Sequence, residues 1–185
     1  MKHIGLIVNP VAGMGGSVGL KGTDGNVEEA RKRGAVPHAT DRAKIALALL
    51  AKSADLAFVT CSGAMGEDVM KEAGITGYQV LYHYAGESSP ADTKKAVRVF
   101  LETGVDLVLF CGGDGTARDV FDVTGTDVPL LGIPAGVKMY SAVFAVDPAS
   151  AADLVLASDR HHLRDAEVMD VDENAYRAGT LKTRL

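Results

Sequence analysis

Apolar residues along this chain alternate between short, nearly continuous runs and stretches in which they recur every three or four positions. Short apolar runs bounded by glycine or polar residues are typical of buried strands, and the longer spacing is typical of amphipathic helices. The expected strands cover residues 4–8, 56–60, 78–82, 105–110, 128–133 and 167–171. The expected helices cover residues 26–32, 41–52, 66–73, 90–104, 116–123 and 148–157.

Local signals indicate where two of these helices begin and which side a third one buries. Ser89 followed by Pro90 predicts a helix start, because serine caps free N–H groups and proline is tolerated in the first turn. Asp147 is the expected cap of the helix over 148–157. In the helix over 41–52, one apolar face is expected, formed by Ile45, Ala48 and Leu49 with Leu50 at its edge.

The order of these elements predicts an α/β fold. We expect an open, mostly parallel, doubly wound (Rossmann-like) sheet with helices on both faces and right-handed crossovers. The strand over 105–110 is apolar except for Asp106, as expected when helices cover both faces of a parallel sheet. Glycine-rich segments follow Val8, Thr60 and Phe110, at the carboxyl ends of strands, where such sheets bind ligands.

Composition narrows the class of partner. The chain has 185 residues and a formal net charge of −5, which argues against a general nucleic-acid binder. A signal peptide and an apolar run long enough to cross a membrane are both missing from the sequence, so we expect no membrane partner and a cytoplasmic location. Cys61 and Cys111 have no metal-ligand spacing, and we expect two reduced thiols near strand ends.

The strongest motif is Gly112-Gly113-Asp114-Gly115-Thr116, directly after an expected buried strand. Glycine N–H groups can approach phosphate oxygens closely, and the amino end of the next helix favours negative charge. An aspartate there would repel a bare anion, so it suggests a metal-bound phosphate or a hydroxyl whose proton it accepts. Thr116 would cap the helix or bond a phosphate. The alternative is a tight turn with a purely structural cap.

Two further loops leave strands at the same edge. Asn9-Pro10 opens a long glycine-rich segment that reaches Gly25; it matches neither a Walker A loop nor GxGxxG, and a flexible surface loop is the alternative. The segment 132–141 carries Lys138, which would meet a phosphate or remain solvated, and ends in Tyr140-Ser141. No metal site is expected: the acidic residues 170, 172 and 173 suit a solvated turn, and structural or solvated roles are expected for the histidines at 83, 161 and 162.

These residues resemble the NAD kinase superfamily, which includes diacylglycerol and sphingosine kinases, and more closely its ATP-NAD kinase branch of the acetoin-catabolism X type. The matching stretches are 8–25, 112–116 and 132–147. The resemblance implies an NAD-kinase N-terminal domain fold and a homo-oligomer. It also implies Mg²⁺-dependent phosphorylation of the 2′-hydroxyl of NAD to NADP by ATP or polyphosphate, with Asp114 as the candidate base.

The nucleotide- and phosphate-binding positions that we predict are Asn9, Pro10, Gly13, Gly15, Gly16, Gly112, Gly113, Gly115, Thr116 and Lys138. Glu167 is the predicted acceptor-binding residue. It is the nearest match to the Asn-Glu motif with which NAD kinases grip the ribose, but Ala166 stands where the asparagine would be. The acceptor is therefore open between NAD and another small alcohol or a lipid.

The expected domain division is a kinase domain over residues 1–165 and the start of a truncated, β-rich C-terminal domain over 166–185. NAD kinases complete their site with such a domain, so this chain alone could be inactive. The alternative function from another class is a non-catalytic, nucleotide-binding accessory protein of acetoin catabolism.

Overall fold

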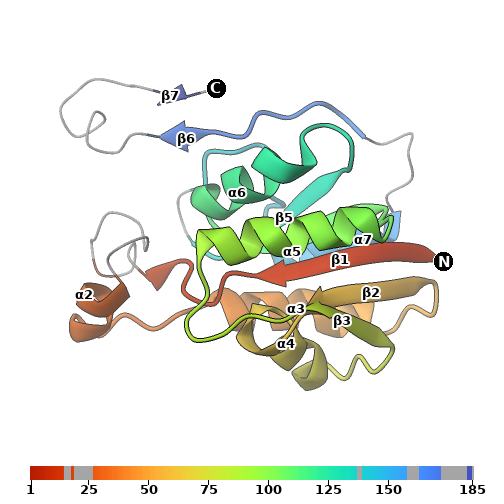
Figure 1. The fold of residues 1–185 in the computed structure, drawn as a ribbon, viewed down its shortest axis with the longest axis horizontal. Helices are drawn as coiled ribbons and strands as arrows, with labels where there is room; N and C mark the ends of the chain where they lie inside the picture. The colour runs from red at the N-terminus through yellow and green to blue at the C-terminus, as the bar shows by residue number, and fades with distance from the viewer. Residues whose placement is uncertain (15–17, 19–26, 137–138, 158–162, 172–182, 185) are drawn as a thin grey trace.

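Five parallel strands form one sheet at the centre of the molecule (Figure 1). The computed structural model describes residues 1–14, 18, 27–136, 139–157, 163–171 and 183–184. Along the sheet the strands stand in the order β3-β2-β1-β4-β5. Their bounds are β1 Lys2–Val8, β2 Leu56–Cys61, β3 Tyr78–Tyr82, β4 Leu107–Gly112 and β5 Leu130–Pro134.

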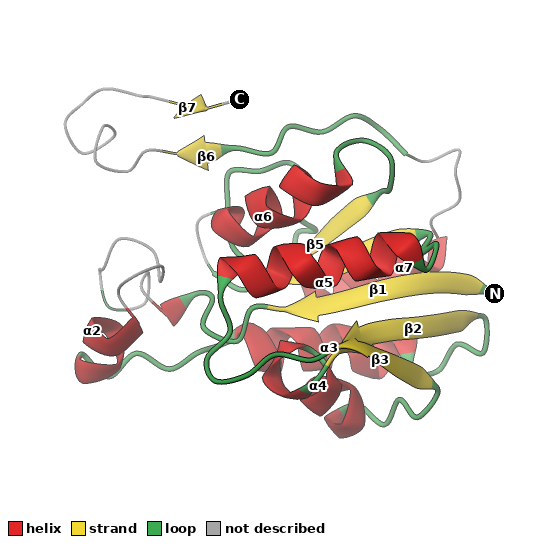
Figure 2. Ribbon diagram, in the orientation of Figure 1, coloured by secondary structure: helices red, strands yellow, loops and turns green. Residues whose placement is uncertain are grey.

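Helices cover both faces of this sheet, as Figure 2 shows. On one face, α3 (Ala39–Leu50), α4 (Glu67–Glu72) and α7 (Pro148–Ala157) share a buried apolar cluster with the strands. On the other face, α5 (Pro90–Glu102) and α6 (Asp114–Thr124) form a second cluster. The remaining elements are α2 (Val27–Lys32), the 3₁₀ turn η1 (Gly63–Met65), β6 (Asp170–Val171) and β7 (Thr183–Arg184). The predicted doubly wound α/β class is confirmed.

β1 lies at the centre of the sheet because its residues are buried on both sides. Ile4, Leu6 and Val8 pack into the cluster under α3 and α7, while Ile7 packs into the cluster under α5. At Gly5 a methyl group would lie 2.7 Å from a ring carbon of Phe100 in α5. The strand therefore needs glycine where α5 crosses it closely.

The sheet reverses its strand order between β1 and β4. From β1 the chain builds β2 and β3 on one side, then crosses to build β4 and β5 on the other. Sheets of this class bind ligands in a crevice at the carboxyl ends of the strands where the order reverses, here the ends of β1 and β4, and we call this place the crevice. At this point the backbone N–H of Asn9 donates to the carbonyl of Cys111, at 2.9 Å.

Two predicted helix starts are confirmed. Ser89 caps α5 in a capping box: its hydroxyl accepts from the Asp92 N–H, and the Asp92 carboxylate accepts from the Ser89 N–H. Asp147 accepts a hydrogen bond from the Ser150 N–H at 2.7 Å at the start of α7. Residue 26, where the helix over 26–32 is expected to begin, lies outside the described residues.

The buried face predicted for α3 is wrong in part. Leu50 is buried and Leu49 is half-buried, as expected, but the other two residues are not. Ile45 is 51% exposed and Ala48 is exposed, whereas Ala43, Ala46 and Leu47 are fully buried. α3 packs against both the sheet and α7, which also buries alanines. Alanine lets two helices approach closely, so the small residues face inward and the larger isoleucine faces solvent.

Several strand predictions are also corrected. β4 starts at Leu107 rather than at 105 and includes Gly112; before it, the N–H of Asp106 donates to the His3 carbonyl. The strand predicted over 167–171 shrinks to β6, which pairs antiparallel with β7 outside the five-stranded sheet. Among the described residues, none of the helices has the length and apolar character needed to cross a membrane.

Candidate functional site

The GGDGT segment joins β4 to α6 at the crevice. Gly112 ends β4, Gly113 is the residue before the helix, and Asp114 is the first helical residue. α6 therefore starts two residues earlier than predicted. The predicted capping role of Thr116 is wrong, because Gly113 holds the capping position and has no side chain with which to bond the N–H groups of the first turn. The amino end of an 11-residue helix is thus available to an anion.

The two glycines of the motif have different surroundings. A methyl group at Gly112 would lie 2.4–2.7 Å from three side-chain atoms of Thr116, so this glycine lets the first turn of α6 fold back on β4. A methyl group at Gly113 would meet no atom within 4 Å, and its backbone is extended (φ −113°, ψ −171°). Neither packing nor backbone geometry explains glycine at 113. The space beside it can admit a ligand atom close to the backbone.

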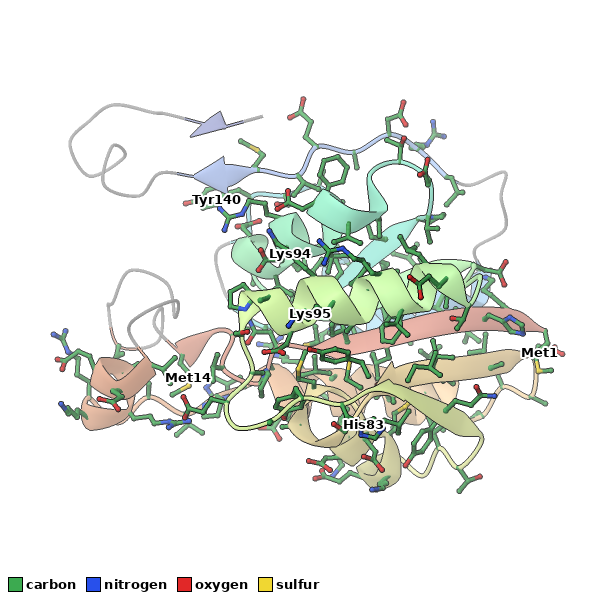
Figure 3. All side chains as sticks on the ribbon, in the orientation of Figure 1. Met1, Met14, His83, Lys94, Lys95 and Tyr140 are labelled. Atoms are coloured by element: carbon green, nitrogen blue, oxygen red, sulfur yellow. The ribbon has the colours of Figure 1, made fainter. Side chains whose placement is uncertain are left out.

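The Asp114 carboxylate is held by the loop after β5. Its Oδ1 accepts from the N–H of Ser141 at 2.8 Å and from the Ser141 hydroxyl at 2.6 Å. The N–H of Tyr140 lies 3.2 Å from Oδ1 and 3.0 Å from Oδ2. Figure 3 shows Tyr140 near the amino end of α6 and beside β6. Oδ1 is thus saturated with donors, while Oδ2 shares one amide and retains capacity to accept another hydrogen bond.

Asn9 ties the loop after β1 to α6. Its side-chain amide donates to the Thr116 hydroxyl at 3.0 Å, and its Oδ1 accepts from the N–H of Val11 at 3.2 Å. Thr116 is 4% exposed, so its hydroxyl lies inside this contact rather than at the surface of the crevice. The structure therefore brings the first two predicted loops together through a side-chain hydrogen bond.

The loop after β1 also packs against the loop after β5. Gly13 has a positive φ of 82°, and a methyl group there would lie 2.3 Å from the Ala135 carbonyl oxygen. Gly136 lies on the other side of this contact, with the Gly13 Cα 3.9 Å from the position of its missing Cβ. Pro10, at the start of the loop, is half-buried. All three predicted loops are consequently neighbours at the carboxyl edge of the sheet.

Glu167 stands near this site through its backbone. Its carbonyl accepts from the N–H of Ala142 at 2.9 Å, and the N–H of Met169 donates to the Ser141 hydroxyl at 3.0 Å. Glu167 itself is exposed. The segment that carries the predicted acceptor-binding residue therefore runs directly beside the residues that hold Asp114.

Sequence reasoning missed Ser141 and Tyr140 as partners of Asp114. It noted the two hydroxyls in the segment 132–141 but favoured Lys138, because a cation beside phosphate is the more familiar signal. A serine at the end of a glycine-rich strand exit was the available clue. Gly15, Gly16 and Lys138 lie outside the described residues, as do the histidines at 161 and 162. Gly115 lies in the first turn of α6, and His83 is exposed.

The described part of the site carries little positive charge. No lysine or arginine occurs in the described loop residues, namely 9–14, 112–116, 134–136 and 139–142. A phosphate here would be met by backbone N–H groups and the amino end of α6. A cavity of about 450 Å³, lined by His3, Val59 and Gln79 among others, lies instead at the amino ends of the strands, away from this chemistry.

At the neighbouring ends of β2 and β3, a second polar group stabilises the fold. The Tyr82 hydroxyl donates to the Asp92 carboxylate at 2.7 Å, and this hydrogen bond is the main reason that the pKa of Tyr82 is raised to about 12. Hydrogen bonds from Ser89 and then from Tyr82 hold the pKa of Asp92 below its usual value. Burial raises the pKa of the Cys61 thiol to about 12. These groups anchor the start of α5 and present no reactive nucleophile.

A cation site made of protein side chains alone is not found among the described residues, where no group of three or more His, Cys, Asp or Glu side chains is placed to hold a metal ion. Asp114 Oδ2 is one carboxylate oxygen with free capacity. That donor set suits Mg²⁺ carried by a nucleotide, since Mg²⁺ is commonly held by one or two carboxylates together with substrate phosphates.

This chain is similar to a known protein family and, more weakly, to a solved structure. The family model described as ATP-NAD kinase N-terminal domain matches residues 4–158. No curated protein matches the chain. One similar solved structure is described as a "putative diacylglycerol kinase from Bacillus anthracis str. Sterne", with 21% identity and a TM-score of 0.42 over 83% of this chain. This chain spans 40% of the length of that protein.

The finer assignment to the acetoin-catabolism branch stays a prediction, and so does the domain division at residue 165. The family match, by contrast, extends over most of the 185 residues and includes the loop after β1, the GGDGT segment and the loop after β5. The chain therefore belongs to the ATP-NAD kinase N-terminal domain family.

Proposed function

We propose that this domain takes part in phosphoryl transfer from ATP or polyphosphate to a hydroxyl group, and that the acceptor is the 2′-hydroxyl of NAD. The observation that carries the proposal is the arrangement of Asp114. Its carboxylate stands at the amino end of α6, with Oδ1 fixed by Ser141 and with Oδ2, which shares the Tyr140 amide, able to accept one more hydrogen bond. A hydroxyl acceptor needs such an oxygen, fixed in direction and within reach of the phosphate site.

The donor phosphates would lie against the backbone of the crevice. The open space beside Gly113 and the free N–H groups at the start of α6 form one wall, and the loops around Gly13 and Gly136 form the other. These groups supply hydrogen bonds without a Cβ in the way. The predicted contacts of Gly15, Gly16 and Lys138 are kept as part of this proposal.

The proposed chemistry is a direct transfer. Asp114 Oδ2 accepts the proton of the acceptor hydroxyl, and the hydroxyl oxygen bonds to the terminal phosphorus. The bond from that phosphorus to the bridging oxygen breaks, and ADP, or polyphosphate shortened by one unit, leaves with the electron pair. Bound Mg²⁺ would neutralise charge on the donor phosphates. The chain's own residues orient the carboxylate and the phosphates.

Other features of the proposal rest on the family resemblance alone. They are Glu167 as an acceptor-binding residue and a homo-oligomeric assembly. A cytoplasmic location is kept as a proposal from the sequence. Ala166 occupies the place of the asparagine that NAD kinases use on the ribose, which favours testing other hydroxyl acceptors beside NAD. A non-catalytic nucleotide-binding role is the second candidate, favoured because Asp114 is the one acidic residue in the described loop residues 9–14, 112–116, 134–136 and 139–142.

The test combines binding with turnover. The melting temperature is measured with ATP plus Mg²⁺, polyphosphate, NAD, NADP and a glycerol-based lipid head group. A ligand at 100 times its Kd adds about 2.7 kcal/mol of stability, which is a shift of roughly 5–10 °C for a chain of this size. Turnover is then measured for the wild type, for Asp114→Asn and for Asp122→Asn. Asp122 is a matched control because it is an exposed aspartate in the same helix, paired with Lys94.

We expect a shift with ATP and with NAD or NADP, and NADP formation that Asp114→Asn reduces at least 100-fold while Asp122→Asn does not. Nucleotide binding with no turnover, unchanged by Asp114→Asn, would favour the non-catalytic candidate. Turnover of the lipid head group in place of NAD would correct the acceptor and leave the reaction class in place.

A further inference from the structure

The Ser141 hydroxyl joins two segments that lie far apart in the sequence. It lies 2.6 Å from Asp114 Oδ1, 27 residues away, and 3.0 Å from the N–H of Met169, 28 residues away. It also lies 3.3 Å from the Met169 carbonyl oxygen. Ser141 is 5% exposed, so water does not compete for these contacts.

The hydroxyl has one proton, so only one of its two possible acceptors receives it. The carboxylate oxygen is closer than the Met169 carbonyl and carries charge, and hydrogen bonds to charged acceptors are the stronger ones. The proton therefore points to Asp114, and the hydroxyl oxygen in turn accepts the N–H of Met169. The three groups form a directed chain, from the Met169 amide through the Ser141 hydroxyl to Asp114 Oδ1.

We propose that Ser141 is the residue that orients Asp114 for catalysis. By saturating Oδ1, it leaves Oδ2 as the oxygen that meets the acceptor hydroxyl. Because its oxygen is bonded by the Met169 amide, it also couples the direction of the carboxylate to the segment 167–169, which runs past the site. Ser141 touches neither substrate nor donor in this role and is a positioning residue.

The surrounding contacts support this assignment. The N–H of Ser141 and the N–H of Tyr140 also point at the carboxylate, and the N–H of Ala142 donates to the Glu167 carbonyl. Of the three successive residues 140–142, the first two therefore donate their amides to Asp114, and the third donates its amide to the segment 167–169. Without its hydroxyl, residue 141 would still offer one amide to Oδ1, but the carboxylate would lose its shortest hydrogen bond and Met169 its acceptor.

This inference rests on the proposed function for its catalytic part, and the test separates the two. The variants are Ser141→Ala, the hydroxyl-retaining Ser141→Thr, and Thr124→Val as a control. Thr124 has a buried hydroxyl bonded to the Val120 carbonyl at the opposite end of α6. Thr124→Val removes a buried hydroxyl hydrogen bond from the same helix without touching Asp114.

The first measurement needs no ligand and no activity. Amide hydrogen exchange of Tyr140, Ser141 and Met169 is followed by NMR in the full chain, corrected for the global stability of each variant. We expect exchange at these three amides to be about tenfold faster in Ser141→Ala, because the Met169 amide loses its acceptor and the carboxylate loses its orientation. Ser141→Thr and Thr124→Val should stay within about twofold of the wild type.

The second measurement is the rate of NADP formation from NAD with ATP and Mg²⁺. A misplaced general base costs about 100-fold in rate, so Ser141→Ala should lower kcat by about that factor with the KM for ATP nearly unchanged. Ser141→Thr should recover most of the rate, and Thr124→Val should keep it. Unchanged exchange in Ser141→Ala overturns the inference whatever the activity.

Two results complete the test. Faster exchange with full turnover in Ser141→Ala, while Asp114→Asn is inactive, overturns the positioning role and leaves a purely structural one. If the wild type turns over no acceptor, the proposed function fails for this chain, and the exchange measurement alone decides whether Ser141 holds the carboxylate.

Discussion

Gly112 and Gly113 are adjacent in the sequence, yet replacing each of them by alanine should have opposite consequences. At Gly112, a methyl group would lie 2.5 Å from the Thr116 Cβ and 2.4 and 2.7 Å from the two atoms beyond it. Real Cβ atoms do not approach so closely, and a Cβ cannot turn away as the end of a flexible side chain can. Thr116 and the first turn of α6 must therefore move.

The cost of Gly112→Ala follows from this overlap. Overpacking a filled interior costs about 1–3 kcal/mol, and contact with a Cβ places this site at the upper end. An unfolding entropy of about 2.1 cal/mol/K per residue gives roughly 0.4 kcal/mol/K for a chain of this length. The melting temperature should consequently fall by about 8 °C.

Gly113→Ala should leave the fold nearly unchanged. No atom lies within 4 Å of the added methyl, and the backbone is extended, which alanine adopts freely. Alanine restricts the unfolded chain and so stabilises by about 0.4–1 kcal/mol, but it is a poorer residue than glycine before a helix by a similar amount. These effects offset one another, and the melting temperature should stay within about 3 °C of the wild type.

For nucleotide binding, Gly113→Ala should be the damaging substitution, although it leaves the stability of the fold nearly unchanged. The methyl at 113 occupies the space where a phosphate would meet the backbone, so the stabilisation by saturating ATP and Mg²⁺ should disappear in Gly113→Ala. Thermal melting of the wild type and both variants, with and without nucleotide, measures both effects in one experiment. A Gly113→Ala variant that keeps the full nucleotide shift would refute the placement of phosphate at this glycine. A Gly112→Ala variant that melts with the wild type would refute the packing argument.

Three further predictions concern other parts of the fold. The pKa of Asp92 is lowered by hydrogen bonds from Ser89 and then from Tyr82, so its contribution to stability is complete above the unfolded value of about 3.9 and is lost as the pH falls through the lower folded value. The difference in melting temperature between the wild type and Asp92→Asn should therefore be largest above about pH 5 and shrink below about pH 4; a constant difference would contradict this. Burial raises the pKa of both the Cys61 and Cys111 thiols to about 12. Neither thiol should therefore react with a thiol reagent at pH 8 until the protein unfolds. A colorimetric thiol assay with and without urea checks this. Gly13→Ala places a methyl 2.3 Å from a carbonyl oxygen at a residue with positive φ. It should lower the free energy of unfolding by about 1–3 kcal/mol and weaken ATP binding. Gly34 also has a positive φ but has open space around it, so Gly34→Ala is the control for backbone strain alone.

Much of the fold could be predicted from short-range patterns and residue preferences in the sequence. The bounds of β3 and α7 match the prediction, because each element is a short apolar or periodic run with a clear stop signal beside it. The capping box at Ser89 was partly readable for the same reason: the serine and proline act within one turn of the helix. The buried face of α3 was not readable. Apolar residues occur on several sides of that helix, and its packing against the sheet and α7 selects the face that carries the alanines.

The sequence by itself determined the alternation of strands and helices, the α/β class and the position of the GGDGT segment at the carboxyl end of a buried strand. These features follow from periodicity and local backbone preference. Only the tertiary structure decided that Gly112 is needed for packing while Gly113 is open, and that Ser141 holds Asp114. The crossover that reverses the strand order places the ends of β1, β4 and β5 side by side. Contacts between their loops depend on this arrangement in space, which the order of residues along each loop does not encode.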